Sequence, residues 1–159
     1  MSVQGAQSSH WDQIFEEISA GRAYTRGAKV TGAAAGQGGV ELFNPFGSGK
    51  EIQVVRAYIG TDAAQSVSFE RINAALTTLL GLGHSLLSGL FDSAAELRTD
   101  TTVPIPGPTI FTSNTQVRSH VTACDMWGPN LSAGEGYVFF ADTVASVLTV
   151  RFDWIERDV

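Results

Sequence analysis

The sequence predicts an all-β fold, an antiparallel β-sandwich of jelly-roll type with a short N-terminal α-helix. Short apolar runs with alternating polar residues recur along the chain, and turns rich in Gly, Pro, Asn and Ser separate them. Helical spacing is clear only near the N-terminus. At 159 residues the chain suits one domain with a single core. We expect an arm with the helix over residues 1–21 and the sandwich over residues 22–159.

The composition restricts the classes of partner. Charged residues make up 16% of the chain, against roughly 25% in an average globular protein. The net charge is −6, and the ten Lys and Arg residues are scattered singly. We therefore expect no nucleic-acid partner, because such proteins carry a basic patch. A thin coat of charge suits a protein that covers part of its surface in an assembly.

The chain gives no sign of an oxidising compartment or of a membrane span. Its single cysteine, Cys124, has no partner for an internal disulfide. The N-terminus lacks the basic region and apolar run of a signal peptide. Three glycines and a histidine interrupt the most apolar segment, residues 74–91. We expect a protein that is made in the cytoplasm and does not insert into a membrane.

An amphipathic helix is predicted near the N-terminus. Ser9 can cap it and Gly21 can end it. Its apolar residues follow the i, i+3, i+4, i+7 spacing of one helix face and are the candidate assembly contacts: Trp11, Ile14, Phe15 and Ile18. Two helical turns are not stable alone in water. The helix therefore either packs on its own domain or docks on a neighbouring subunit, and the sequence leaves both open.

A tight turn lies inside the β-rich stretch of residues 40–60. Its structural motif consists of Asn44, Pro45, Gly47, Ser48 and Gly49. Residues 47–50 spell Gly-Ser-Gly-Lys, but a phosphate-binding loop would need Gly at Asn44 and Ser or Thr at Glu51. The flanks also predict strands. We interpret the motif as a turn between two antiparallel strands, in which Asn44 caps the turn and the glycines take positive φ.

Further strands follow this turn. The apolar residues of residues 52–59 change face in mid-strand, so either both faces are covered or a bulge shifts the phase. A shorter strand is expected over residues 67–70. Residues 74–97 predict an irregular, leucine-rich crossover, which would be a subunit interface if its own domain did not cover it. Three prolines place residues 101–108 at an edge or in an extended arm.

The C-terminal third predicts strands over residues 117–124, 137–141 and 147–155, with turns over residues 127–130 and 131–136. The last strand has the cleanest alternation in the chain. Its apolar face consists of Leu148, Val150, Phe152 and Trp154. It should be an antiparallel strand with one buried face.

No motif indicates catalysis, a cofactor or a metal. His10, His84 and His120 lie far apart, and none has a second His or Cys at the spacing of metal ligands. The chain contains no Gly-x-Ser-x-Gly elbow and no His-Glu-x-x-His motif. We expect a protein that is not an enzyme.

Two motifs together resemble small structural proteins of tailed-bacteriophage virions. One is the Asn-Pro-x-Gly-Ser-Gly turn before a strong strand, here Asn44 to Gly49. The other is an Ala-Gly-x-Gly turn, with Gly134 and Gly136, that leads to a closing strand with Phe152, Trp154 and Glu156. The resemblance implies a β-sandwich or jelly-roll virion subunit, a head decoration or spike or a tail or fibre component. Such proteins commonly form trimers.

The resemblance leaves two functional classes open. The first is a non-enzymatic virion protein that docks on coat or tail subunits through apolar surface, as a homotrimer. The second is a module of a spike or fibre that binds a host receptor or glycan. Sugar sites use exposed aromatic rings beside polar loops, and Trp127, in a Gly-Pro-Asn turn, is the candidate ligand aromatic. A core or turn-packing role for Trp127 also stays open.

Overall fold

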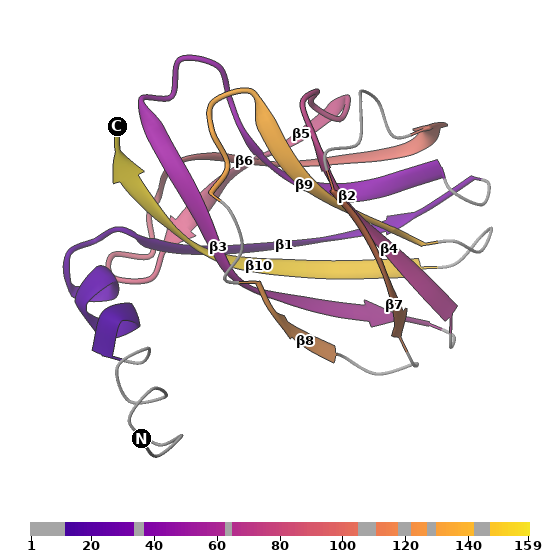
Figure 1. Cartoon of the computed structure of the whole chain (residues 1–159), viewed down its shortest axis with the longest axis horizontal. Helices are drawn as coiled ribbons and strands as arrows, with labels where there is room; N and C mark the ends of the chain where they lie inside the picture. The colour runs from indigo at the N-terminus through magenta and orange to yellow at the C-terminus, as the bar shows by residue number, and fades with distance from the viewer. Residues whose placement is uncertain are drawn as a thin grey trace.

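The computed structural model describes residues 12–33, 37–62, 65–104, 111–117, 122–126, 130–141 and 147–159. A helix over residues 12–19 precedes the strands (Figure 1). The strands are β1 Ala23–Thr31, β2 Gln37–Asn44, β3 Lys50–Thr61, β4 Gln65–Ile72, β5 Thr78–Ser85, β6 Phe91–Pro104, β7 Phe111–Val117, β8 Thr122–Asp125, β9 Glu135–Ala141 and β10 Val147–Asp158.

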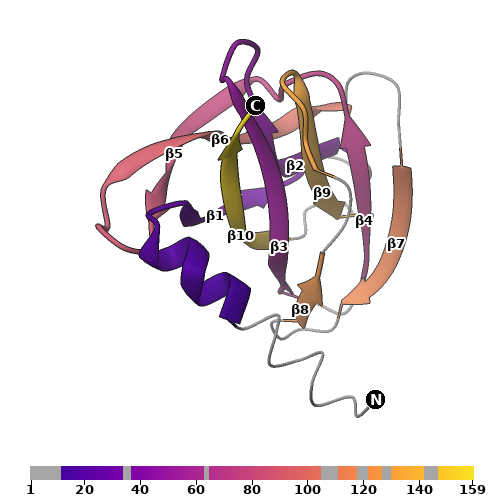
Figure 2. The same cartoon turned by 60° about the vertical axis from the view of Figure 1, so that its left-hand side comes forward.

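The strands form one antiparallel sheet in the order β7-β4-β9-β2-β6-β5-β1-β10-β3-β8. The eight strands from β4 to β3 in this order make a strongly curled half-barrel, and β7 and β8 extend its two edges (Figures 1 and 2). The predicted β class, the antiparallel pairing and the N-terminal helix are confirmed. The predicted division into two sheets is not seen, because hydrogen bonds connect the described strands into a single sheet.

The pairing between β1 and β5, which we call the β1–β5 joint, is nevertheless short. β1 and β5 pair at only two positions, Tyr24 with Ser85 and Thr25 with His84. Beyond them, the guanidinium of Arg26 donates hydrogen bonds to the backbone carbonyls of Leu80 and Leu82 in β5. In this part of the joint, hydrogen bonds from the Arg26 side chain connect the two strands in place of bonds between backbone groups. The curl then brings the strands on either side of the joint face to face.

One hydrophobic core fills the concave face of the sheet. Phe152 of β10 contacts Phe139 of β9, with ring centroids 5.7 Å apart, so aromatic rings connect the two halves of the curl. The predicted inner face of β10 is confirmed: Leu148, Val150, Phe152 and Trp154 are all buried. The alternation of apolar and polar residues along β10 therefore identifies a strand whose inner face packs in the hydrophobic core.

A β-bulge explains the change of face in β3. Val54 pairs with Trp154, and Arg56 pairs with Asp153, so Val55 has no partner in β10. Ile52 and Val54 before the bulge and Ala57 and Ile59 after it then all join the same core. Of the two explanations that the sequence leaves open, the bulge is confirmed.

The turn between β2 and β3 has the predicted local chemistry. Gly47 and Gly49 have φ values of 76° and 66°. The Asn44 side chain donates hydrogen bonds to the carbonyls of Lys50, at 2.8 Å, and Leu131, at 3.0 Å. The two strands do not pair with each other, however, since β2 lies between β9 and β6 and β3 between β10 and β8. The turn crosses between the halves of the curl and closes no hairpin.

The prediction of an irregular crossover over residues 74–97 is wrong for most of that segment. Only residues 73–77, which we call the strap, are irregular. β5 and β6 follow as a paired hairpin. The glycines that make a helix unfavourable here instead let side chains of nearby strands pack closely against the β5 backbone. A Cβ at Gly81 would lie 2.9 Å from the Arg26 guanidinium, and one at Gly83 would overlap the Trp154 indole.

Two other strand predictions need correction. β6 continues to Pro104, whose partner is Gln37 of β2, while β5 ends its pairing with β6 at Thr99. The edge or arm predicted for residues 101–108 is thus seen only locally: Pro104 ends an interior strand of the sheet and pairs with β2 alone, and residues 105–108 lie outside the described residues. The predicted strand over residues 117–124 is divided, since β7 ends at Val117 and β8 begins at Thr122. Residues 118–121 lie outside the described residues.

A buried carboxylate joins the two halves of the curl. Glu156 of β10 is 3% exposed and accepts four hydrogen bonds. The donors are Ser93 Oγ at 2.8 Å, the amides of Ala94 and Ala95 at 2.9 and 3.0 Å, and Trp154 Nε1 at 3.0 Å. Three of these donors belong to β6, in the other half of the curl. Glu156 is therefore a structural acid whose lone pairs are used by backbone and side-chain donors.

The strap covers a second buried acid on the convex face. It crosses β9, β2 and β6 to connect β4 with β5. Leu76 of the strap packs with Ile72 and Val138, and its amide donates to Glu41 Oε2 at 2.7 Å. Arg98 donates to the Leu76 carbonyl at 2.9 Å. Glu41 Oε1 is buried without a hydrogen-bond partner among the described residues. Burial raises the pKa of Glu41 to about 8.

Replacing Glu156 by alanine should strongly destabilise the fold. The Glu156→Ala change leaves buried donors without an acceptor, and we expect the unfolding free energy to fall by about 3 kcal/mol. Urea unfolding followed by circular dichroism measures this loss. The control is Glu16→Ala at an exposed helix position, which should change stability by no more than about 0.5 kcal/mol. Equal effects of the two changes would contradict the bridging role.

Glu41 should make stability depend on pH. Between its ordinary pKa of 4.5 and the folded value of about 8, the folded chain keeps a proton that the unfolded chain releases. Its contribution is therefore complete below the unfolded pKa and is lost as pH rises through the folded pKa, by up to about 1.4 kcal/mol per pH unit. Glu41→Gln should flatten this slope, while Glu16→Gln keeps it. Urea midpoints across this range provide the measurement, and an unchanged slope in Glu41→Gln would contradict the prediction.

Candidate interaction surface

The N-terminal helix packs on its own sheet. Glu17 is 8% exposed and lies between two arginines, with Arg22 Nε at 2.5 Å and Arg157 Nη2 of β10 at 3.1 Å. The hydrogen bonds from these arginines hold the pKa of Glu17 below its usual range, although its burial acts in the opposite direction. Ile14 and Ile18 are half-buried. Of the two alternatives for the helix, packing on its own domain is the one seen.

The helix nevertheless leaves one large apolar side chain in solvent. Phe15 is 62% exposed, whereas the predicted face would bury it with Ile14 and Ile18. The Glu17 contacts with Arg22 and Arg157 set the rotation of the helix. Phe15 is thus available for contact with a partner.

The turn of the β5–β6 hairpin, residues 86–90, lies beside the helix in both views (Figures 1 and 2). We call it the leucine turn, because Leu86, Leu87 and Leu90 are 44%, 60% and 64% exposed. It is connected to the start of β1, since the Leu86 amide donates to the Ala23 carbonyl at 2.8 Å. The leucine turn and the helix that carries Phe15 are thus neighbouring elements with exposed apolar side chains, and such side chains mark contact sites.

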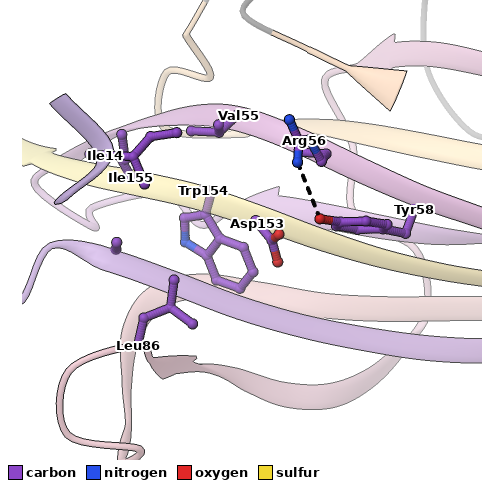
Figure 3. A pocket seen from close by; sticks show the side chains of 9 residues that line it. Ile14, Val55, Arg56, Tyr58, Leu86, Asp153, Trp154 and Ile155 are labelled. Carbon is purple, nitrogen blue, oxygen red and sulfur yellow. Dashed lines mark hydrogen bonds between the residues drawn. The ribbon is translucent and has the colours of Figure 1, made fainter. Parts of the chain in front are cut away.

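A cavity of about 150 Å³ lies between the helix, the leucine turn and the convex face of the sheet. We call it the helix–sheet cavity. Figure 3 shows Ile14, Val55 and Ile155 on one side of it and Leu86 on the other, with Trp154 between them. The bulge at Val55 turns that side chain out of the core toward the helix. The walls are therefore mostly apolar.

Polar side chains form one end of this cavity. Arg56 donates to the Tyr58 hydroxyl at 3.4 Å (Figure 3). The guanidinium of Arg151 lies 3.9 Å from the centre of the Tyr58 ring and contacts Asp153 at 3.4 Å. The Thr25 hydroxyl also donates to Asp153 at 2.6 Å. These mutual contacts hold the polar end in place and give the cavity a charged rim beside an apolar floor.

A second exposed feature is formed by the two turns that carry the family resemblance. The Gly134 amide donates to the Asn44 carbonyl at 2.7 Å, and Leu131 exchanges both backbone hydrogen bonds with Ile52. Gly134 has a φ of 89°, and a Cβ there would overlap the Phe46 ring. Phe46 is still 78% exposed. Segments far apart in sequence thus build one two-turn cluster that presents an aromatic ring.

The predicted site residues have different outcomes. The structure brings Asn44, Pro45, Gly47, Ser48 and Gly49 into the two-turn cluster. Ile14 lines the helix–sheet cavity, and Phe15 is exposed nearby. Trp11 and Trp127 lie outside the described residues. Sequence reasoning missed Phe46 as an exposed aromatic, although its position between Pro45 and Gly47 in a turn could have indicated it.

The described ranges offer neither a cluster of metal ligands nor a membrane-spanning helix. No group of three or more His, Cys, Asp or Glu side chains that could hold a metal occurs among them. Within the same ranges, no helix has the length and apolar character needed to cross a bilayer. His84, the one histidine inside these ranges, has its Nδ1 3.3 Å from the Gly89 carbonyl in the leucine turn.

No protein-family model matches the chain, and no curated protein matches it.

Proposed function

We propose that the chain is a non-enzymatic structural protein of a tailed-bacteriophage-like virion, a head decoration or spike or a tail-associated subunit that docks on coat or tail proteins. The observation that carries this proposal is the exposure of the apolar side chains of Phe15 and the leucine turn. Side chains of this size on a chain with few charges favour a protein that buries part of its surface against a partner.

The virion context is supported by the sequence resemblance. The two motifs that carry it are separated by more than half of the chain, yet they contact each other in the two-turn cluster. They therefore act as one structural unit. A sandwich or jelly-roll classification belongs to the same proposal. It is supported by the narrow β1–β5 joint, across which two groups of strands face each other around one core.

The proposal predicts that the chain is a component of purified particles and that Phe15 contributes to its retention. In a lysate that encodes the chain, it should sediment with the particles in a density gradient. Burial of a phenylalanine ring stabilises a contact enough that Phe15→Ser should weaken retention about tenfold or more. Immunoblots of gradient fractions after serial dilution measure the retained fraction.

The matched control is Phe46→Ser, which removes a second strongly exposed phenylalanine, at 78%. Phe46 belongs to the two-turn cluster, away from the helix, so this variant should be retained like the unmodified chain. A chain that remains at the top of the gradient would contradict the virion role. Equal retention of the two variants would contradict docking through Phe15.

A second candidate function is binding of a host receptor or glycan. The observation that favours it is Phe46, an exposed ring on a backbone turn with polar neighbours such as Ser48 and Ser132. Sugars stack on aromatic rings of this kind. If this candidate is right, Phe46→Ala should weaken adsorption to cells or retention on a glycan array by about tenfold. Phe15→Ala is the control, and unchanged binding by Phe46→Ala would exclude this role for the two-turn cluster.

A further inference from the structure

The leucine turn is a rigid projection. The buried Ser85 hydroxyl accepts hydrogen bonds from the amides of Leu87 and Ser88 at 3.2 and 3.3 Å. The Ser85 carbonyl accepts the Gly89 amide at 2.8 Å, and the Ser85 amide donates to the Leu90 carbonyl at 2.9 Å. Gly89 has a φ of 71°. Backbone and serine hydrogen bonds thus define the turn.

The leucines themselves contribute little to this turn. The hydrogen bonds that shape it come from backbone groups and the Ser85 hydroxyl, and a turn of this kind favours small polar residues over leucine. Leu87 and Leu90 are nevertheless 60% and 64% exposed. Large apolar side chains that protrude from a rigid loop are favoured at interfaces, so these two leucines are candidate contacts for a partner.

The helix–sheet cavity beside the turn has the size and chemistry to accept such a side chain. Its volume is about 150 Å³, and an apolar cavity of about this size is known to bind benzene. The branched side chain of leucine, with four carbon atoms, is smaller than benzene and would fit such a volume. Ile14, Val55 and Ile155 supply apolar walls, and Leu86 belongs both to the turn and to the cavity lining. Projection and cavity are therefore adjacent on one face.

The charges beside the two features have opposite signs. Asp92, two residues beyond Leu90, is exposed. The rim of the cavity carries Arg56 and Asp153, and Arg151 contacts Asp153, so the two arginines outnumber the one carboxylate there. A second copy that places its leucine turn at the cavity would bring its acidic side chain toward a basic rim. Charge complementarity thus favours contact between turn and cavity over contact between two turns.

We propose that this chain self-associates by inserting the leucine turn of one copy into the helix–sheet cavity of a second copy. Because the projection and the cavity share one face, two copies can exchange these contacts reciprocally, as in an isologous interface. The inference rests on the geometry of this face and does not depend on the virion proposal. A chain that is absent from particles could still self-associate in this way.

The experiment measures the mass of the purified full chain over a concentration series by sedimentation equilibrium. Leu87→Ser removes the projection at an exposed position, so the fold should be preserved. Ala23→Leu fills the cavity, whose lining includes the buried Ala23. Each change should weaken self-association about tenfold or more. Circular dichroism verifies that each variant is folded.

The matched control is Leu79→Ser, which removes a leucine that is 50% exposed in β5 and lines no part of the cavity. This variant should associate like the unmodified chain. A monomeric unmodified chain would overturn the proposal. Association that survives Leu87→Ser would also overturn it, as would association that Ala23→Leu leaves unchanged or strengthens, since general apolar adhesion would not be reduced by an added leucine.

Discussion

The carboxylate of Glu156 is the interaction on which the curl of the sheet most depends. The β1–β5 ladder has only two residue pairs, so backbone bonding alone would connect the two groups of strands weakly. Glu156 reaches from β10 to β6 and accepts donors from both strands. Its bond from Trp154 also orients the indole that lies on Gly83. The Glu156 side chain thereby connects β10 with β6 across the core and fixes the position of Trp154 beside the β1–β5 joint.

Much of the fold could be predicted from local patterns. The alternation of β10, the positive φ of Gly47 and Gly49, and the side-chain cap of Asn44 all follow from short-range chemistry, and the structure has each of them. Pairing partners could not be predicted in this way. The turn after Asn44 has the composition of a hairpin, yet it crosses between halves of the curl, because strand order depends on contacts distant in sequence.

The leucine-rich segment shows why the candidate surface was only partly predictable. Its leucines and glycines suggested an interrupted helix, since a glycine in a helix is costly. In the structure Gly81 and Gly83 leave room for Arg26 and Trp154, residues that lie more than fifty positions away. The sequence could indicate that Leu87 is exposed only if the rest of the domain left this segment uncovered, and the sequence does not show whether it does. The spacing places Phe15 on one helix face with Ile14 and Ile18, but it does not show that Glu17 fixes the rotation of the helix and leaves Phe15 exposed.

The arginine at the β1–β5 joint has a mechanical consequence. A backbone ladder fixes the angle between two strands through many short, directional hydrogen bonds, whereas at this joint the bonds beyond the two backbone pairs come from one long side chain. We therefore expect the angle between the two groups of strands to vary more easily along this line than across the longer ladders on either side.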